Sequence, residues 1–246
     1  MDKEQIKRTL KSLPGKKDNI IGIYNYCDYW CERCMFTSHC ANFQISKELG
    51  NDSEANDLNN QKFWDNFSNL LEATLELLTE KMAEFGFEPD DSTEQTDTWI
   101  KDVSRQPLVK KAKSYSLKVH KWLEAYTKSK TSSKVFHLTS TSLFSQKVGE
   151  AIEVITWYSI FISAKTSRAF SSGRYEEDDQ YDSDGSVKIT IVAIDRSMSA
   201  FTQLWELEKE YEDDILYFLT RLSSLKKGLL KRFPDAMDFK RPGFDD

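Results

Sequence analysis

Apolar side chains recur at intervals of three and four residues along most of this chain, the spacing of one face of an α-helix. One such run begins at Phe63 and continues to Phe85, where Gly86 and Pro89 end it. The cleanest run lies between Leu108 and Tyr126. We therefore predict long helices over 63–85, 108–129, 145–171, 187–205 and 210–233, after a short helix at 3–12.

The segment VKITIVAI at 187–194 is ambiguous, because its β-branched residues also suit a strand. No second segment offers a partner strand, and an isolated strand is not stable. The helical spacing also continues through Trp205, which favours a helix. Residues 145–171 are apolar on more than one side, which is typical of a central helix. The predicted fold class is all-α, with a bundle of four to five helices over 61–246 and a cysteine-rich module and linker over 1–60.

Composition supports this class and indicates a compartment. Nine Gly and five Pro among 246 residues are too few for the many tight turns of an all-β fold. The net charge is −6, and no run of eighteen apolar residues is present to span a bilayer. The N-terminus lacks the apolar region of a secretion signal, so we expect a cytoplasmic protein.

The candidate chemistry is concentrated in one loop that contains every cysteine of the chain. Cys27, Cys31, Cys34 and Cys40 have the spacing C-x3-C-x2-C-x5-C. Two disulfides inside so short a loop would be cramped, and a reducing compartment disfavours them. Four inert thiols are equally disfavoured, because chance does not gather all cysteines of a chain in one loop. The cluster therefore predicts a metal site with these four residues as ligands.

Two cofactors remain as alternatives. Structural zinc usually takes two C-x2-C pairs separated by about a dozen residues or more, and only Cys31 and Cys34 form such a pair. A [4Fe–4S] cluster takes four thiolates and favours a dry pocket, which the surrounding aromatic residues would supply. The spacing therefore favours a [4Fe–4S] cluster, with zinc as the alternative. His39 is a candidate to replace one cysteine as ligand.

The loop partly resembles those of two enzyme families. Cys31-x2-Cys34-x5-Cys40 is similar to the last three ligands in the iron–sulfur loop of endonuclease III-type DNA glycosylases. In that family the first ligand stands six residues upstream, whereas Cys27 stands three upstream, and a preceding helix–hairpin–helix domain is missing here. The resemblance thus implies the cofactor and not the activity. Cys27-x3-Cys31-x2-Cys34 resembles the radical SAM triad, but Arg33 replaces the usual aromatic residue and the repeated β–α units are lacking.

The chain as a whole is similar to an uncharacterised bacterial protein family. Four motifs carry this resemblance: YCDYWCERCMFTSHC at 26–40, DSDGS at 182–186, IDRS at 194–197 and RPGFD at 241–245. The resemblance covers most of the length and implies no particular reaction.

Charged residues interrupt two of the predicted apolar faces. Asp195 lies within one of them, and Lys165 and Arg168 lie within another. Because buried charges are costly unless they are paired, we expect a buried pair that fixes helix register. A polar pocket between the helices, with an enzymatic role, is the alternative.

Further candidates are weaker. Four lysines lie opposite the apolar face of 108–129, and they indicate a solvated face more than a docking strip for an anionic partner such as nucleic acid: Lys110, Lys118, Lys121 and Lys128. The acidic stretch 176–185 fails as a calcium loop, because Ile191 stands where the bidentate Glu belongs, and is expected to be a solvated connection. His120 with Glu124, and His137, belong to no recognised site motif.

The leading hypothesis is a cytoplasmic [4Fe–4S] protein with a redox, sensing or interaction role. A zinc-stabilised helical adaptor that recruits a protein partner is the first alternative. An enzyme with a pocket near Asp195 is the second.

Overall fold

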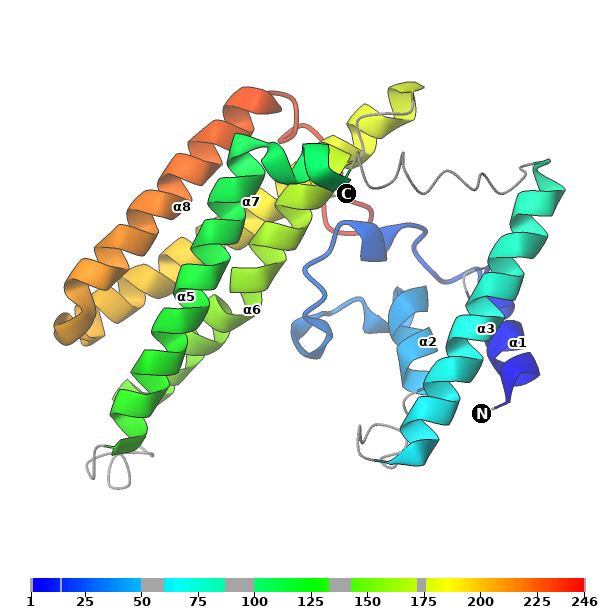
Figure 1. The fold of residues 1–246 in the computed structure, drawn as a ribbon, viewed down its shortest axis with the longest axis horizontal. Coiled ribbons are helices and arrows are strands. Elements are labelled where there is room, and N and C mark those ends of the chain that lie inside the picture. Colours follow the sequence, from blue (N-terminus) through cyan, green and yellow to red (C-terminus); the bar gives the residue numbers. More distant parts are fainter. Residues whose placement is uncertain are drawn as a thin grey trace. The chain divides into compact units, whose positions relative to one another are not determined.

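A computed structural model describes residues 2–13, 15–49, 60–86, 100–132, 143–171 and 176–245 (Figure 1). Within these ranges all regular structure is helical and no strand is present, so the predicted all-α class is confirmed. The ambiguous segment 187–194 lies inside helix α7 (Glu176–Leu207). Its β-branched residues are packed in a helical core, since no strand lies among the described residues to pair with it.

The chain divides into two compact units. The first contains Met1–Thr93 together with Arg241–Asp246, and the second contains Glu94–Lys240. Helix α3 (Gln61–Glu84) therefore groups with the cysteine loop, although its predicted place was in the bundle. Whether the functional boundary lies near residue 60 stays a prediction, and residues 50–59 of the expected linker lie outside the described part of the chain.

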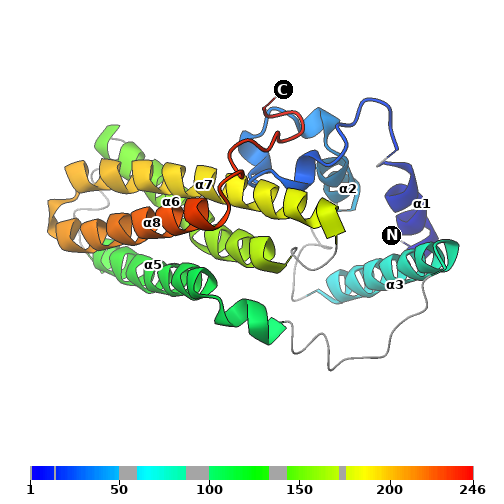
Figure 2. The ribbon, with the colours of Figure 1, turned by 90° about the horizontal axis from the view of Figure 1, so that it is seen from above.

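The second unit is an up-and-down four-helix bundle. Its helices are α5 (Pro107–Ser132), α6 (Leu143–Ser171), α7 and α8 (Glu212–Arg232). Each packs against the next helix along the chain, and α5 also packs against α8, which closes the bundle (Figures 1 and 2). Apolar stripes at helical spacing meet in the centre, where the rings of Phe201 and Phe218 stack with centroids 5.2 Å apart.

Residues 145–171, which lie in α6, were expected to be the central helix of the bundle. Instead, α7 is the most deeply buried helix. On α6 the side chains of Trp157 and Ile160 are 37% and 65% exposed, so this helix has a solvent face. On α7 all residues from 185 to 191 are buried. Lys188 tolerates this burial because its Nζ donates a hydrogen bond of 2.6 Å to the carbonyl oxygen of Phe239.

The acidic stretch 176–185 is a further correction to the sequence analysis. It was expected to be a connection between helices, but α7 begins at Glu176 and includes it. Arg168 of α6 forms a bidentate pair with Asp182, with Nη2 to Oδ1 at 2.7 Å and Nε to Oδ2 at 3.2 Å. This pair fixes the early turns of α7 against α6, and so supports a helix where composition indicates a loop.

The first unit joins three helices to the cysteine loop. Asp2 caps α1 (Lys3–Ser12) by accepting a hydrogen bond from the Gln5 backbone N–H, and the Gln5 side chain returns the contact in a capping box. Helix α1 packs against α3 and against α2 (Ala41–Leu49). The segment between α1 and α2 contains three short 3₁₀ turns: η1 (Ile23–Asn25), η2 (Cys31–Arg33) and η3 (Thr37–His39).

Candidate metal centre

The 3₁₀ turns wrap the cysteine loop upon itself. Cys31 begins η2, and the backbone N–H of Cys34 closes that turn on the Cys31 carbonyl at 3.1 Å. Cys40 follows η3 in the same way, and its N–H bonds to the Thr37 carbonyl at 3.4 Å. Between Cys27 and Cys31 the chain reverses through Tyr29, which has a positive φ of 58°. Each cysteine therefore lies at or next to a turn.

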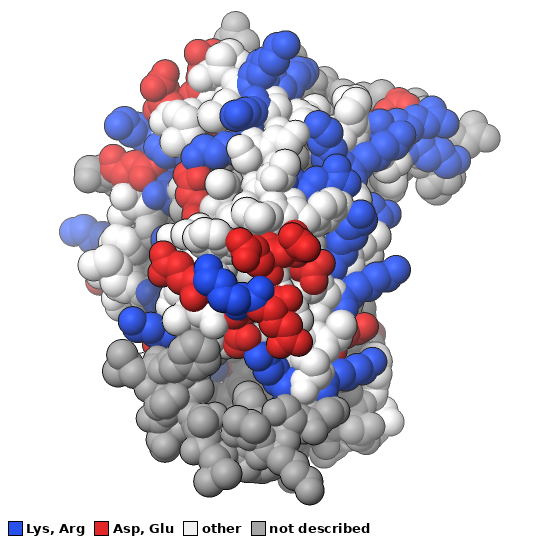
Figure 3. Space-filling model, turned by 90° about the vertical axis from the view of Figure 1, so that its left-hand side faces the viewer, with Lys and Arg blue, Asp and Glu red and all other residues white. Residues whose placement is uncertain are grey.

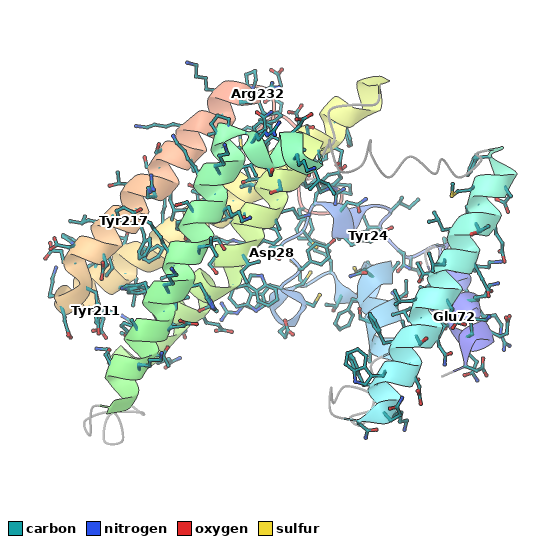
Figure 4. All side chains as sticks on the ribbon, in the orientation of Figure 1. Tyr24, Asp28, Glu72, Tyr211, Tyr217 and Arg232 are labelled. Carbon is teal, nitrogen blue, oxygen red and sulfur yellow. The ribbon has the colours of Figure 1, made fainter. Side chains whose placement is uncertain are left out.

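The structure brings all four cysteines to the wall of one cavity. The cavity has a volume of about 20 Å³, which is room for about one water molecule. All four thiols are half-buried and none forms a disulfide. The remaining lining is largely apolar and includes Ile23, Trp30, Phe43 and Phe244. Tyr24 and Asp28, labelled in Figure 4, lie on the same loop and also line the cavity.

Backbone groups already contact two of the sulfur atoms. The N–H of Phe36 donates a hydrogen bond to Cys34 Sγ at 3.4 Å, and Cys27 Sγ donates to the carbonyl of Tyr24 at 3.6 Å. N–H donors directed at a sulfur stabilise a thiolate and tune a metal centre bound to it. Among the described His, Cys, Asp and Glu side chains, no three lie close enough together to hold a single ion.

Burial raises the pKa of the Cys31 thiol, and the neighbouring Cys40 and Cys34 raise it further. Thiol groups in such surroundings stay protonated near neutral pH unless a metal displaces the protons. His39 is not among the residues that line the cavity, and its Nδ1 lies 2.7 Å from the carbonyl oxygen of Asp18.

The C-terminal segment supplies part of the cavity wall, which was not expected from the sequence. Phe244 lines the cavity and packs edge-on against Phe36, with ring centroids 5.0 Å apart. Arg241 and Asp245 hold the segment in a tight turn through a salt bridge of 2.8 Å. Gly243 in this turn has a φ of 76°, and an added Cβ would lie 3.0 Å from the Ile20 side chain. The motif RPGFD, noted only as a resemblance, was the available signal.

Arg33, which stands where radical SAM enzymes usually have an aromatic residue, contacts the wall of the cavity. The guanidinium of Arg33 lies over the ring of Trp30, with its carbon 3.9 Å from the ring centroid. Trp30 is only 7% exposed and forms part of the cavity wall. Arg33 therefore makes a cation–π contact with an aromatic residue of the cavity wall. An aromatic side chain at position 33 would carry no charge for this contact.

The predicted site around Asp195 does not form. Asp195 pairs with Lys226 of α8, its Oδ2 lying 2.7 Å from Nζ, and its side chain is 51% exposed. Arg168 binds Asp182 instead, and Lys165 is buried on α6, where its Nζ lies 5.7 Å from the Phe161 ring. The helical rotation that places Ile194 in the core directs Asp195 outward, so an exposed pair of small energetic value replaces the expected buried one.

The lysine strip on α5 is a solvated face that also contacts α8. Lys118 Nζ donates to the Tyr217 hydroxyl at 2.7 Å, and this cation lowers the pKa of that phenol. Figure 3 shows Lys and Arg side chains along the side formed by α5, with Asp and Glu gathered near the turn between α7 and α8. His120 and Glu124 form an exposed pair at 3.3 Å, and His137 lies outside the described residues.

Comparisons with known proteins assign neither a family nor a function to the chain. No protein-family model, no curated protein and no solved structure matches the chain. Within the described residues, no helix is long and apolar enough to cross a membrane.

Proposed function

We propose that the first unit is a metal-binding module whose ligands are Cys27, Cys31, Cys34 and Cys40, and that the bound group is a [4Fe–4S] cluster. The observation that carries the proposal is the meeting of all four cysteines on one cavity with an apolar, aromatic wall. Bound to four thiolates, such a cluster transfers electrons, responds to oxidants or stabilises a fold. We therefore propose a redox, sensing or interaction role in a reducing, cytoplasmic compartment.

The chain's own residues would perform three tasks around the cluster. The four thiolates would hold it, and the Phe36 N–H would stabilise the Cys34 sulfur. Trp30 and Phe244 would exclude water, which protects a cluster and affects its reduction potential. Because the cavity has room for about one water, the turns that bear the cysteines would have to move outward to admit a cube.

Zinc remains the alternative, because four thiolates are also its usual structural ligands, although the cysteines of the described loop would have to move closer together to hold a single ion. The protein would then be an adaptor whose cysteine module is stabilised by the metal. An enzymatic site near Asp195 is not proposed, because the observed pair with Lys226 accounts for that residue.

Anaerobic purification followed by iron, zinc and acid-labile sulfide analysis tests the proposal. We expect brown protein with about four iron atoms and four sulfides per chain. The single variants Cys31→Ala and Cys34→Ala should be colourless, whereas the control His39→Ala should keep the colour because His39 does not line the cavity. Colourless wild-type protein with one zinc would support the adaptor, and protein without either metal would refute a metal site.

A further inference from the structure

Helix α3 contacts α1 through a row of ion pairs. Glu76 Oε1 and Oε2 bind Lys3 and Lys7 of α1 at 2.7 and 2.8 Å. One turn further along, Glu80 binds Lys7 at 3.0 Å and Lys11 at 2.7 Å. Successive residues at i, i+4 and i+8 on α1 thus form a ladder with successive turns of α3. The packed side of α3 therefore combines this row of ion pairs with Ala73, which is fully buried.

The opposite side of α3 is apolar and open. We call it the α3 stripe, and its members are Trp64, Phe67, Leu71, Leu75, Leu78 and Phe85. In this order their exposed fractions are 51, 44, 48, 61, 56 and 73%. At 100° per residue all six fall within an arc of about 80° that contains no charged residue. An amphipathic helix normally buries such a stripe, whereas α3 buries the other face.

The open area lies at the upper end of the range for the largest apolar patch of a monomeric protein. Each side chain of the stripe exposes on the order of 100 Å², so one copy offers roughly 600 Å² of apolar surface. Contiguous apolar patches of this size mark interaction sites. Two such stripes facing each other would bury roughly 1,200 Å², which reaches the range of stable protein interfaces.

The size and the lack of charge of the stripe favour another copy of α3 as the occupant. The stripe extends the length of α3, from its first turn to the residue after Glu84. An uncharged stripe also meets a copy of itself under two-fold symmetry without placing like charges in contact.

We propose that two copies of this chain associate through their α3 stripes to form a homodimer. The ion-pair ladder of each copy holds α1 against the reverse side of α3, so each stripe lies open to its counterpart. Because α3 and the cysteine loop belong to the same unit, the dimer joins two cysteine modules. This inference is independent of which metal the module binds.

Sedimentation velocity of the full chain over 1–100 µM tests the dimer. The wild type should sediment with twice the chain mass of 28.6 kDa. The double variant Leu71→Glu/Leu78→Glu should sediment as a monomer, because it places charges in the centre of the stripe. Ile160→Glu is the matched control, since Ile160 is a 65% exposed apolar residue of α6, and it should remain dimeric.

The milder pair Leu71→Ala/Leu78→Ala distinguishes a lost interface from a misfolded helix. It should keep the circular dichroism of the wild type and weaken dimerisation by at least about tenfold. A monomeric wild type throughout this concentration range, or a glutamate double variant that stays dimeric, would overturn the proposal. Metal analysis on the same samples reports separately on the cysteine site, so failure of one proposal is not confused with failure of the other.

Discussion

Phe244→Ala tests whether the C-terminal segment closes the candidate metal cavity. Phe244 is partly buried, so on the order of 1 kcal/mol of the 1.5–3 kcal/mol for complete burial of a Phe side chain is lost. The edge-on contact with Phe36 adds about 1 kcal/mol. The variant should therefore destabilise the closed cavity by about 2 kcal/mol, which corresponds to about a thirtyfold larger population of the open form.

Transfer of bound metal to a chromogenic chelator measures this population, because the chelator reaches the metal through the open form. Phe244→Ala should release metal about thirtyfold faster than the wild type, with the same metal content at the start. Met237→Ala is the control, because this residue is exposed and does not line the cavity. Equal release rates for Phe244→Ala and the wild type would show that the segment does not close the site, and would refute this reasoning.

Three further predictions concern the ligands, the ladder and the bundle. Cys34→Ala should abolish metal binding while circular dichroism retains most of the helix signal, because a metal stabilises chiefly what folds around it. Hydrogen bonds from Lys3 and Lys7 lower the pKa of Glu76 to about 2, so the ladder contributes stability above pH 4.5 and loses it as the pH falls towards 2. In Glu76→Gln this dependence on pH should disappear. Hydrogen exchange of the α1 amides, measured across an acid titration, tests this. Burial raises the pKa of Tyr126, which donates to Glu208 at 3.0 Å, so stability should be complete below about pH 10 and fall above it. Glu208→Ala should lower the free energy of unfolding in urea by about 2 kcal/mol, because the buried hydroxyl loses its acceptor.

Each of these predictions has an opposing outcome. Global loss of helix in Cys34→Ala would show that the cysteine module and the bundle unfold as one cooperative domain. If the α1 amides lose their protection from hydrogen exchange equally at pH 3 in the wild type and in Glu76→Gln, the ladder is not the acid-sensitive contact. A free energy of unfolding in Glu208→Ala within about 0.5 kcal/mol of the wild type would contradict the role given to the buried hydrogen bond.

Local pattern was sufficient to predict most of the long helices and the four-cysteine group, but not the short helix α2. The runs at 63–85, 108–129 and 145–171 correspond to α3, α5 and α6, because a periodic apolar face specifies a helix wherever it is later buried. Cysteine spacing within one loop is likewise a local property, so the candidate ligands were evident without a structure. The beginning of α7 was missed because its acidic residues are typical of loops, and a pair with Arg168 of another helix supports them there.

Tertiary structure decided which residues meet. Periodicity marks the apolar stripe of α3 but does not say what covers it, and the ladder with α1 occupies the other face. Asp195 was expected to bind a cation of α6, yet Lys226 of α8 reaches it, because helix order and rotation are set by the packing of the whole bundle. Phe244 completes a cavity more than 200 residues away in sequence, since closing a long loop requires little more entropy than closing a short one. Composition and spacing are read along the chain, whereas a binding site is formed by contacts across it.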